Sequence, residues 1–113
     1  MHELSLAEGV LQIVEESAQR QGFTRVKEIR LEIGALSGVE IEALRFCIEA
    51  VLRNSLAEGA RVIIEPIPAR GRCMQCGEMV EIAARYDACP QCGCQLVQPA
   101  GGTEMRVKDL LVE

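Results

Sequence analysis

The 113-residue sequence predicts an α+β fold (mixed α/β), with two helices on a small three-stranded sheet and a cysteine-rich lobe inserted before the last strand. Three observations predict this class. Two segments carry apolar residues at helical spacing, and three others have the apolar character of strands. Residues 70–101 lack such periodicity and hold five of the six cysteines. A chain of this length can bury a modest core of its own.

The first predicted helix covers residues 4–21. One face is apolar and the opposite face is charged or polar, which is the pattern of an amphipathic helix. Its apolar positions are Leu4, Ala7, Val10, Leu11, Val14 and Ala18. Ser5 followed by Glu8 resembles a capping box at the start of the helix. Gly22 is a typical helix stop.

The second predicted helix covers about residues 39–54. Ser37 and Glu40 form another S-x-x-E start signal, which follows the turn at residues 34–38. The apolar face consists of Ile41, Leu44, Cys47, Ile48, Val51 and Leu52. On this face Cys47 is expected to behave as a small apolar residue.

Three segments are predicted to be strands. Residues 26–33 alternate apolar and charged side chains over their second half, which indicates a half-buried strand. Residues 61–67 form a second strand, stopped by prolines, and residues 104–112 form a terminal strand. The first two strands are joined through a helix, and a crossover of this length favours a parallel pair.

The domain organisation follows from the last strand. A two-stranded sheet has an open edge, and the terminal strand is expected to return and cover it. Residues 1–69 and 102–113 would then form one α/β domain, and residues 70–101 would form an inserted second domain. Strand order beyond this is not predicted.

Composition and charge exclude several functional classes. The formal net charge is -5, and residues 70–101 carry three arginines against three acids, so contact with nucleic acid or anionic lipid is not expected. No run of about 18 apolar residues suggests a membrane span. No signal peptide is visible at the N-terminus, so the expected location is the cytoplasm. In that compartment cysteines are more often metal ligands than disulfides.

The cysteine motif predicts a zinc site. Cys73 and Cys76 form one C-x-x-C pair, and Cys89 and Cys92 form a second, each followed by glycine. Two such pairs supply four thiolates, which complete a tetrahedron around Zn²⁺. The glycine permits the left-handed backbone that such a turn tends to use. The lobe is therefore expected to be a four-cysteine zinc ribbon.

Two other uses of these cysteines are alternatives to a zinc site. A rubredoxin-like iron site also uses paired C-x-x-C turns, but only Tyr86 could provide aromatic shielding within the lobe. A redox dithiol would need one such pair at a helix N-terminus. Four thiolates leave no open position on the metal, so a structural role is expected and catalysis is not. Cys94 is a spare thiol that is either idle or a substitute for Cys92.

The N-terminus offers a second set of metal donors. His2 is the only histidine in the chain, and an isolated histidine is most often an exposed side chain without a metal. At position 2, however, the α-amine of Met1, the amide nitrogen of His2 and its imidazole can close adjacent chelate rings on one ion. Nitrogen-rich planar coordination suits Ni(II) or Cu(II). Glu3 could add its amide nitrogen or its carboxylate.

Together these motifs resemble the HypA/HybF family of nickel metallochaperones over the full length of the chain. The resemblance is carried by the Met1-His2-Glu3 start, the Cys73–Cys92 motif, and shorter stretches. These stretches are Ile33-Gly34, Ser37, Phe46-Cys47 and residues 55–59. The combination in this order is specific, although each motif alone is weak.

The resemblance implies a nickel carrier that is not an enzyme. It implies that Met1, His2 and Glu3 bind nickel, that the four cysteines hold structural zinc, and that residues 1–69 with 102–113 form the nickel-binding domain. Glu40 matches an acidic residue tied to nickel in some relatives, but a capping role with Ser37 is at least as good an interpretation. The implied partners are a maturation GTPase of the HypB type and the precursor of the [NiFe]-hydrogenase large subunit; a homodimer is also left open.

Two functions from other classes remain as alternatives. The first is a zinc-ribbon adaptor or regulatory module that transfers no nickel. The second is a rubredoxin-like electron carrier. Metal content distinguishes them, because a nickel carrier should bind zinc and also take up Ni(II) through His2.

Overall fold

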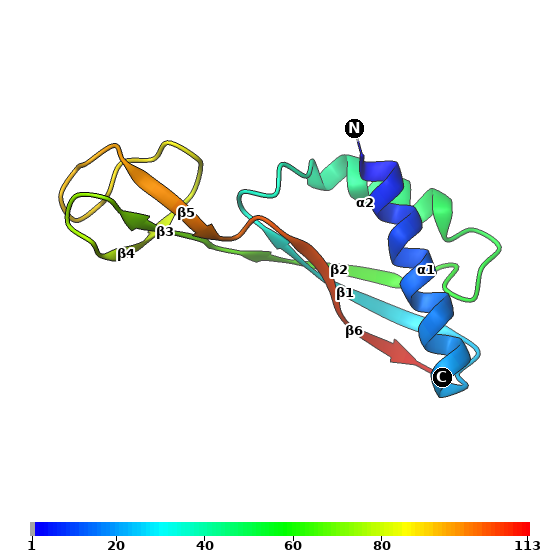
Figure 1. The fold of residues 1–113 in the computed structure, drawn as a ribbon. Helices are drawn as coiled ribbons and strands as arrows, with labels where there is room; N and C mark the ends of the chain where they lie inside the picture. Colours follow the sequence, from blue (N-terminus) through cyan, green and yellow to red (C-terminus); the bar gives the residue numbers. More distant parts are fainter. Residues whose placement is uncertain (1) are drawn as a thin grey trace. The chain divides into compact units, whose positions relative to one another are not determined.

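The computed structural model describes residues 2–113, and Met1 lies outside the described residues. Its helices are α1 (Glu3–Gln21) and α2 (Ile41–Val51). Its strands are β1 (Val26–Gly34), β2 (Arg61–Ile67), β3 (Ala69–Cys73), β4 (Met79–Ile82), β5 (Val97–Gly101) and β6 (Met105–Val112). They form two three-stranded sheets with the orders β2-β1-β6 and β4-β3-β5 (Figure 1). The predicted α+β class is confirmed, and the second sheet is an addition to it.

Strands β1 and β2 run in the same direction. Before β2 begins, the carbonyl of Leu56 accepts a hydrogen bond of 3.0 Å from the N–H of Val26, the first residue of β1. Just past the other end of β1, the N–H of Ala35 donates to the carbonyl of Ile67, the last residue of β2, also at 3.0 Å. The predicted parallel pair is confirmed. Pro66 is accommodated because β2 is an edge strand, where a missing N–H is tolerated.

Strand β6 covers the other edge of β1 and runs antiparallel to it. The N–H of Gly34 donates to the carbonyl of Glu104 at 2.8 Å, and the N–H of Glu113 donates to the carbonyl of Arg25 at 2.9 Å. The end of one strand therefore meets the start of the other. The prediction that the terminal strand returns to the first sheet is confirmed.

The core beside the helices is aliphatic. α1 packs against α2, and both lie on the same side of β1 (Figure 1). Alternate residues of β1, including Ile29 and Leu31, are fully buried. The helices contribute further buried side chains, which are Ala7, Val10, Val14, Leu44 and Ile48. Burial of each valine, leucine or isoleucine side chain stabilises the fold by about 1.5–3 kcal/mol.

The start of the first helix differs from the prediction. α1 begins at Glu3 with His2 as its N-cap, and the N–H of Leu6 already donates to the carbonyl of His2 at 2.9 Å. Ser5 therefore lies inside the helix, so the Ser5–Glu8 capping box is wrong. The predicted stop at Gly22 is confirmed, with φ of 78°.

The second helix is shorter than predicted. α2 begins at Ile41 with Glu40 as its N-cap and ends at Val51, where residues 39–54 were expected. Ser37 lies three residues before this cap, so an S-x-x-E box starting at Ser37 does not describe the start of α2. The N-cap amide of Glu40 has its partner in a distant segment of the chain, the side chain of Glu3.

The chain divides into two compact units. Unit 1 is Met1–Leu31, Val39–Ile64 and Val107–Glu113, and unit 2 is Glu32–Gly38 and Glu65–Arg106. Both helices belong to unit 1 and the second sheet belongs to unit 2. The assignment of a nickel-binding and a zinc-binding domain to residues 1–69 with 102–113 and to 70–101 stays a prediction.

The second sheet has a small core of its own. β3 is its central strand, and pairs antiparallel with both neighbours. The buried residues of this core are Leu36, Ala69, Cys73, Val80, Ile82, Cys89 and Val97. Two of them are cysteines of the predicted metal site. A core this small gives the lobe little stability from burial alone, which is the usual reason for a structural metal in a small domain.

No helix within residues 2–113 combines the length and apolar character needed to cross a membrane.

Candidate metal sites

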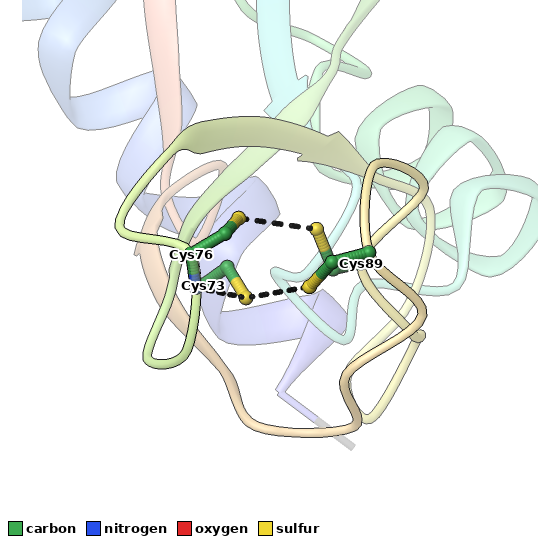
Figure 2. A group of neighbouring side chains, drawn as sticks. Cys73, Cys76 and Cys89 are labelled. Atoms are coloured by element: carbon green, nitrogen blue, oxygen red, sulfur yellow. Dashed lines mark hydrogen bonds between the residues drawn. The ribbon is translucent and has the colours of Figure 1, made fainter.

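Four cysteines from two loops converge in unit 2. Cys73 ends β3 and Cys76 follows in the turn before β4, whereas Cys89 and Cys92 lie between β4 and β5. Their Sγ atoms all lie within 4.8 Å of one another. Figure 2 labels Cys73, Cys76 and Cys89, and shows the thiols of Cys76 and Cys89 pointing toward each other. The structure therefore brings together the four predicted zinc ligands.

The two C-x-x-C turns have the same backbone design. The N–H of Gly77 donates to the carbonyl of Cys73 at 2.9 Å, and the N–H of Gly93 donates to the carbonyl of Cys89 at 2.8 Å. Both glycines have positive φ, 76° for Gly77 and 79° for Gly93. L side chains rarely adopt this conformation, so the predicted role of the glycines is confirmed. In each turn the first cysteine is buried and the second is exposed.

The sulfur distances fit a tetrahedral metal. Cys73 Sγ lies 3.5 Å from Cys92 Sγ, and Cys76 Sγ lies 3.9 Å from Cys89 Sγ. A tetrahedron with metal–sulfur bonds of 2.3 Å has sulfur–sulfur edges of about 3.8 Å. Disulfide bonds require about 2.05 Å, and these cysteines are free thiols. The group can hold one divalent ion in a closed four-thiolate shell.

Hydrogen bonds and crowding move the pKa values of these thiols apart. The N–H of Cys76 donates to Cys73 Sγ at 3.4 Å, and this bond is the main reason that the pKa of Cys73 falls to about 6. The N–H of Cys94 favours the thiolate of Cys92, but the thiol of Cys73, burial and the other thiols outweigh it and raise the pKa of Cys92 to about 12. Thiols this close cannot all ionise without a cation, so metal binding must release protons.

Cys94 lies outside this group of four. Its side chain is half-buried and packs against the core of the lobe. Its Sγ accepts a hydrogen bond of 3.3 Å from the N–H of Leu96. The sequence left open whether Cys94 replaces Cys92, and the convergent set contains Cys92.

The N-terminal candidates gather in unit 1 at the start of both helices. His2 is the N-cap of α1 and its side chain is exposed. The carboxylate of Glu3 accepts a hydrogen bond of 3.1 Å, through Oε2, from the backbone N–H of Glu40, the N-cap of α2. This bond joins residues 37 positions apart and brings His2 and Glu3 to Glu40. Met1 lies outside the described residues.

The same hydrogen bond determines the electrostatics of Glu3. It favours the carboxylate over the neutral acid and is the largest cause of a lowered pKa for Glu3. The sequence identified Glu40 through its side chain and missed its main-chain N–H. No local signal could have revealed this role, because any residue other than proline carries such an N–H.

A helical unit with a mixed sheet, together with a lobe holding four convergent thiols, defines a small metal-binding α/β protein. A family model described as hydrogenase/urease nickel incorporation metallochaperone HypA matches residues 1–112. The chain belongs to the HypA family.

Individual relatives from this family match the chain over almost their whole length. A hydrogenase maturation factor HypA of Azoarcus sp. (strain BH72) is 62% identical over 110 residues, covering 97% of this chain and 96% of the relative. Another from Dechloromonas aromatica (strain RCB) is 57% identical over 113 residues, the full length of both chains. The solution structure of the Ni metallochaperone HypA from Helicobacter pylori matches with a TM-score of 0.71 and 24% identity, covering 99% of this chain and 97% of that one. That likeness shows the shared fold.

Proposed function

We propose that this protein binds Ni(II) at its N-terminus and delivers it for maturation of the [NiFe]-hydrogenase large subunit. The observation that carries the proposal is the contact of Glu3 with Glu40, which holds the His2-Glu3 start against the second helix in a chain of the HypA family. The side chain of His2, the residue before Glu3, is exposed. A carrier needs such an accessible site because it must take up the ion and also surrender it.

The donors are the α-amine of Met1, the amide nitrogen and imidazole of His2, and a group from Glu3. Amine, amide and imidazole nitrogens at adjacent positions close five- and six-membered chelate rings, a planar arrangement that suits Ni(II) better than Zn²⁺. The side chain of Glu40 is a further candidate donor. In this protein nickel is cargo. Because all of these donors lie within residues 1–40, residues 1–69 with 102–113 form the proposed nickel-binding domain.

Zinc is the proposed occupant of the four-cysteine site in the domain of residues 70–101. The sulfur distances of 3.5 and 3.9 Å support this assignment because they lie on either side of the edge length of a zinc–thiolate tetrahedron. Cys73, Cys76, Cys89 and Cys92 leave no open position for a substrate, so the zinc is structural. The protein is accordingly a carrier and not an enzyme.

The proposed partners are a maturation GTPase of the HypB type and the hydrogenase large-subunit precursor, and a homodimer is a third proposed assembly. The relatives that match along their whole length are named hydrogenase maturation factors, which supports a role in that process. We propose the cytoplasm as the site of this work.

Nickel titration of the zinc-loaded protein tests the proposal. The native chain, prepared without residues before Met1, should bind Ni(II), and His2→Ala should lose this binding. A chain extended by two or more residues before Met1 keeps the histidine but removes the α-amine, so it should also lose binding. Gln19→Ala, an exposed change on the same helix, is the matched control and should bind as the native chain does.

Zinc content is measured in the same samples. All of these variants should hold about one zinc per chain because none alters a cysteine. Unchanged nickel affinity in both His2→Ala and the extended chain would contradict the N-terminal site. A native chain that holds zinc but takes up no nickel would instead favour a zinc-ribbon adaptor.

A further inference from the structure

Strand β6 forms one edge of the first sheet, and β2 forms the other (Figure 1). An open sheet edge tends to pair with a strand of another chain, and proteins usually protect such edges. The β2 edge is protected, because Pro66 has no N–H and the guanidinium of Arg45 donates to the carbonyl of Val62 at 2.8 Å. Strand β6 has eight residues and contains no proline. Of the two edges, β6 is therefore the one suited to accept a further strand.

The main chain near the end of β6 turns polar groups toward its free edge. The N–H of Glu113 donates to the carbonyl of Arg25 at 2.9 Å, and the carbonyl of Glu113 accepts from the N–H of Thr24 at 3.2 Å. Both main-chain groups of Glu113 thus point toward the segment that leads into β1. Successive residues of an antiparallel strand turn these groups to opposite sides. The N–H and carbonyl groups of Val112 and Leu110 therefore point away from the sheet, where an added strand could bind them.

An apolar groove lies between α1 and β6 in unit 1. It has a volume of about 320 Å³, and its apolar lining consists of Ile13, Phe23, Val107, Leu110 and Val112. Ile13 and Val112 are large apolar side chains that remain 44% and 36% exposed. Removal of such surface from water is favourable. A strand added to β6 would therefore gain from apolar contacts as well as from main-chain hydrogen bonds.

The charges of β6 are ordered along the strand. Arg106 and Lys108 lie in its first half, whereas Asp109 lies in its second half and Glu113 directly follows it. Asp109 and Glu113 have ion-pair partners within the chain but remain about half exposed. When two copies of β6 pair antiparallel, the basic half of each lies beside the acidic half of the other. A second copy of this chain is therefore complementary in charge to the edge that it would cover.

Like charges select one register for such a pair. A two-fold axis at Leu110 sets Asp109 opposite Leu111 of the second copy. An axis at Asp109 would instead place the two Asp109 carboxylates opposite each other, and an axis at Leu111 would place Asp109 opposite Glu113. Like charges directly opposite each other are destabilising. The favoured register therefore pairs Leu110 with its own copy.

We propose that β6 is a self-association surface, along which two copies of this chain pair antiparallel with Leu110 at the two-fold axis. This inference rests on the homodimer included in the proposed function and assigns a surface to it. Each copy places Leu110 and Val112 beside the groove of the other, so the contact is reciprocal, as a two-fold dimer requires. None of the proposed metal donors lies on β6, so association and metal binding can be measured separately.

Sedimentation equilibrium of the zinc-loaded native chain measures the association. The average mass should rise from that of a monomer toward that of a dimer as the concentration increases to about 1 mM. Val112→Pro removes an N–H that faces the partner in each copy, so the dissociation constant should rise about tenfold or more. Val112→Ile keeps this N–H and a branched apolar side chain. It is the matched control, with a dissociation constant within about threefold of native.

Cysteine cross-linking tests the register and does not depend on the proline variant. The zinc-loaded chain with Cys47→Ser and Cys94→Ser provides the background, because its remaining thiols bind zinc. Adding Leu110→Cys would set two thiols opposite each other, with Cα atoms about 5.5 Å apart, a separation that suits a disulfide. Leu111→Cys is the control because position 111 lies opposite Asp109 in this register. Treatment with oxidised glutathione should give several-fold more covalent dimer from Leu110→Cys than from Leu111→Cys.

The outcomes separate this inference from nickel binding. A native chain that stays monomeric throughout the concentration series would overturn the self-association surface. Equal dissociation constants for the native chain and a folded Val112→Pro, or equal cross-linking at positions 110 and 111, would also overturn it. Circular dichroism shows whether Val112→Pro folds, and if it does not, the cross-linking comparison decides. A native chain that dimerises in this way but takes up no nickel would contradict the proposed nickel site and leave the surface in place.

Discussion

The main chain of Gly102 approaches Gly34 so closely that Gly34 has no room for a side chain. A Cβ atom placed on Gly34 would lie 2.2 Å from the carbonyl oxygen of Gly102. That carbonyl also accepts a hydrogen bond of 2.7 Å from the N–H of Leu36. A Cβ on Gly102 itself would lie 2.5 Å from the Cα of Ala69, at a φ of +83°. Steric crowding therefore explains why glycine occupies position 34 in the Ile33-Gly34 stretch.

Gly34→Ala is expected to destabilise unit 2 by more than about 2 kcal/mol, because the clash is with main-chain atoms that cannot move independently. Urea unfolding measured by a probe in residues 65–106 checks this. Gly9→Ala is the matched control, since a Cβ at Gly9 meets nothing within 4 Å. In the helix interior that change should stabilise by about 0.5–1 kcal/mol. Similar effects of the two substitutions would contradict the close approach.

Removal of the metal from the four-cysteine site should unfold the lobe and spare the helices. The core of unit 2 is small and includes Cys73 and Cys89, so metal binding supplies folding free energy there. Both described helices lie in unit 1. A strong chelator should therefore collapse the NMR dispersion of residues 65–106 while most of the helical circular dichroism remains. Retained dispersion after complete zinc loss would show that the lobe folds without metal.

Cys92 and Cys94 should behave differently toward zinc although they are two residues apart. Cys92→Ser removes a ligand and should weaken zinc binding by at least about tenfold, since loss of an outer-shell partner alone costs that much. Cys94→Ser leaves the four convergent thiols in place and should keep near-native affinity. Competition with a chromogenic zinc chelator measures both. Equal losses of zinc affinity in Cys92→Ser and Cys94→Ser would indicate that Cys94 is also a metal ligand.

Acidification should remove the stabilising contact of Glu3. The N–H of Glu40 lowers the pKa of Glu3 from its ordinary value of 4.5 in the folded protein. The unfolded chain then binds the proton more readily than the folded one. The contact therefore contributes its full stabilisation above about pH 4.5, and this stabilisation is lost as the pH falls through the lower pKa of the folded protein. NMR titration of the Glu3 carboxyl carbon gives the shift directly.

Unfolding at several pH values checks the same linkage. The stability difference between the native chain and Glu3→Gln should be present at neutral pH and shrink on acidification below the ordinary pKa of Glu3. Glu15→Gln makes the same charge change on the exposed surface of α1 and serves as the control. A difference that does not change with pH would rule out the charge of Glu3 as its source.

The local patterns predicted most of the secondary structure because they reflect burial. Ile29 and Leu31 alternate with charged residues along β1 and are fully buried, and Leu44 and Ile48 face the core from α2 at helical spacing. The helix starts were wrong at Ser5 and Ser37 for a shared reason. A serine followed by glutamate is a local capping signal, but each helix has another residue as its N-cap, His2 for α1 and Glu40 for α2, and neither cap makes a side-chain capping bond of its own.

By itself, the sequence determined the α+β class, the parallel pair of β1 and β2, the return of the terminal strand to their sheet, and the four thiols with their two glycines. These features depend on periodicity, connection length and motif spacing, which act over short stretches of chain. Only the tertiary structure decided that Glu3 caps α2 at Glu40, that Gly34 touches Gly102, and that Cys94 stays outside the convergent set. Such contacts join main-chain atoms or distant segments. No residue type predicts them, because they exist only once the chain has folded.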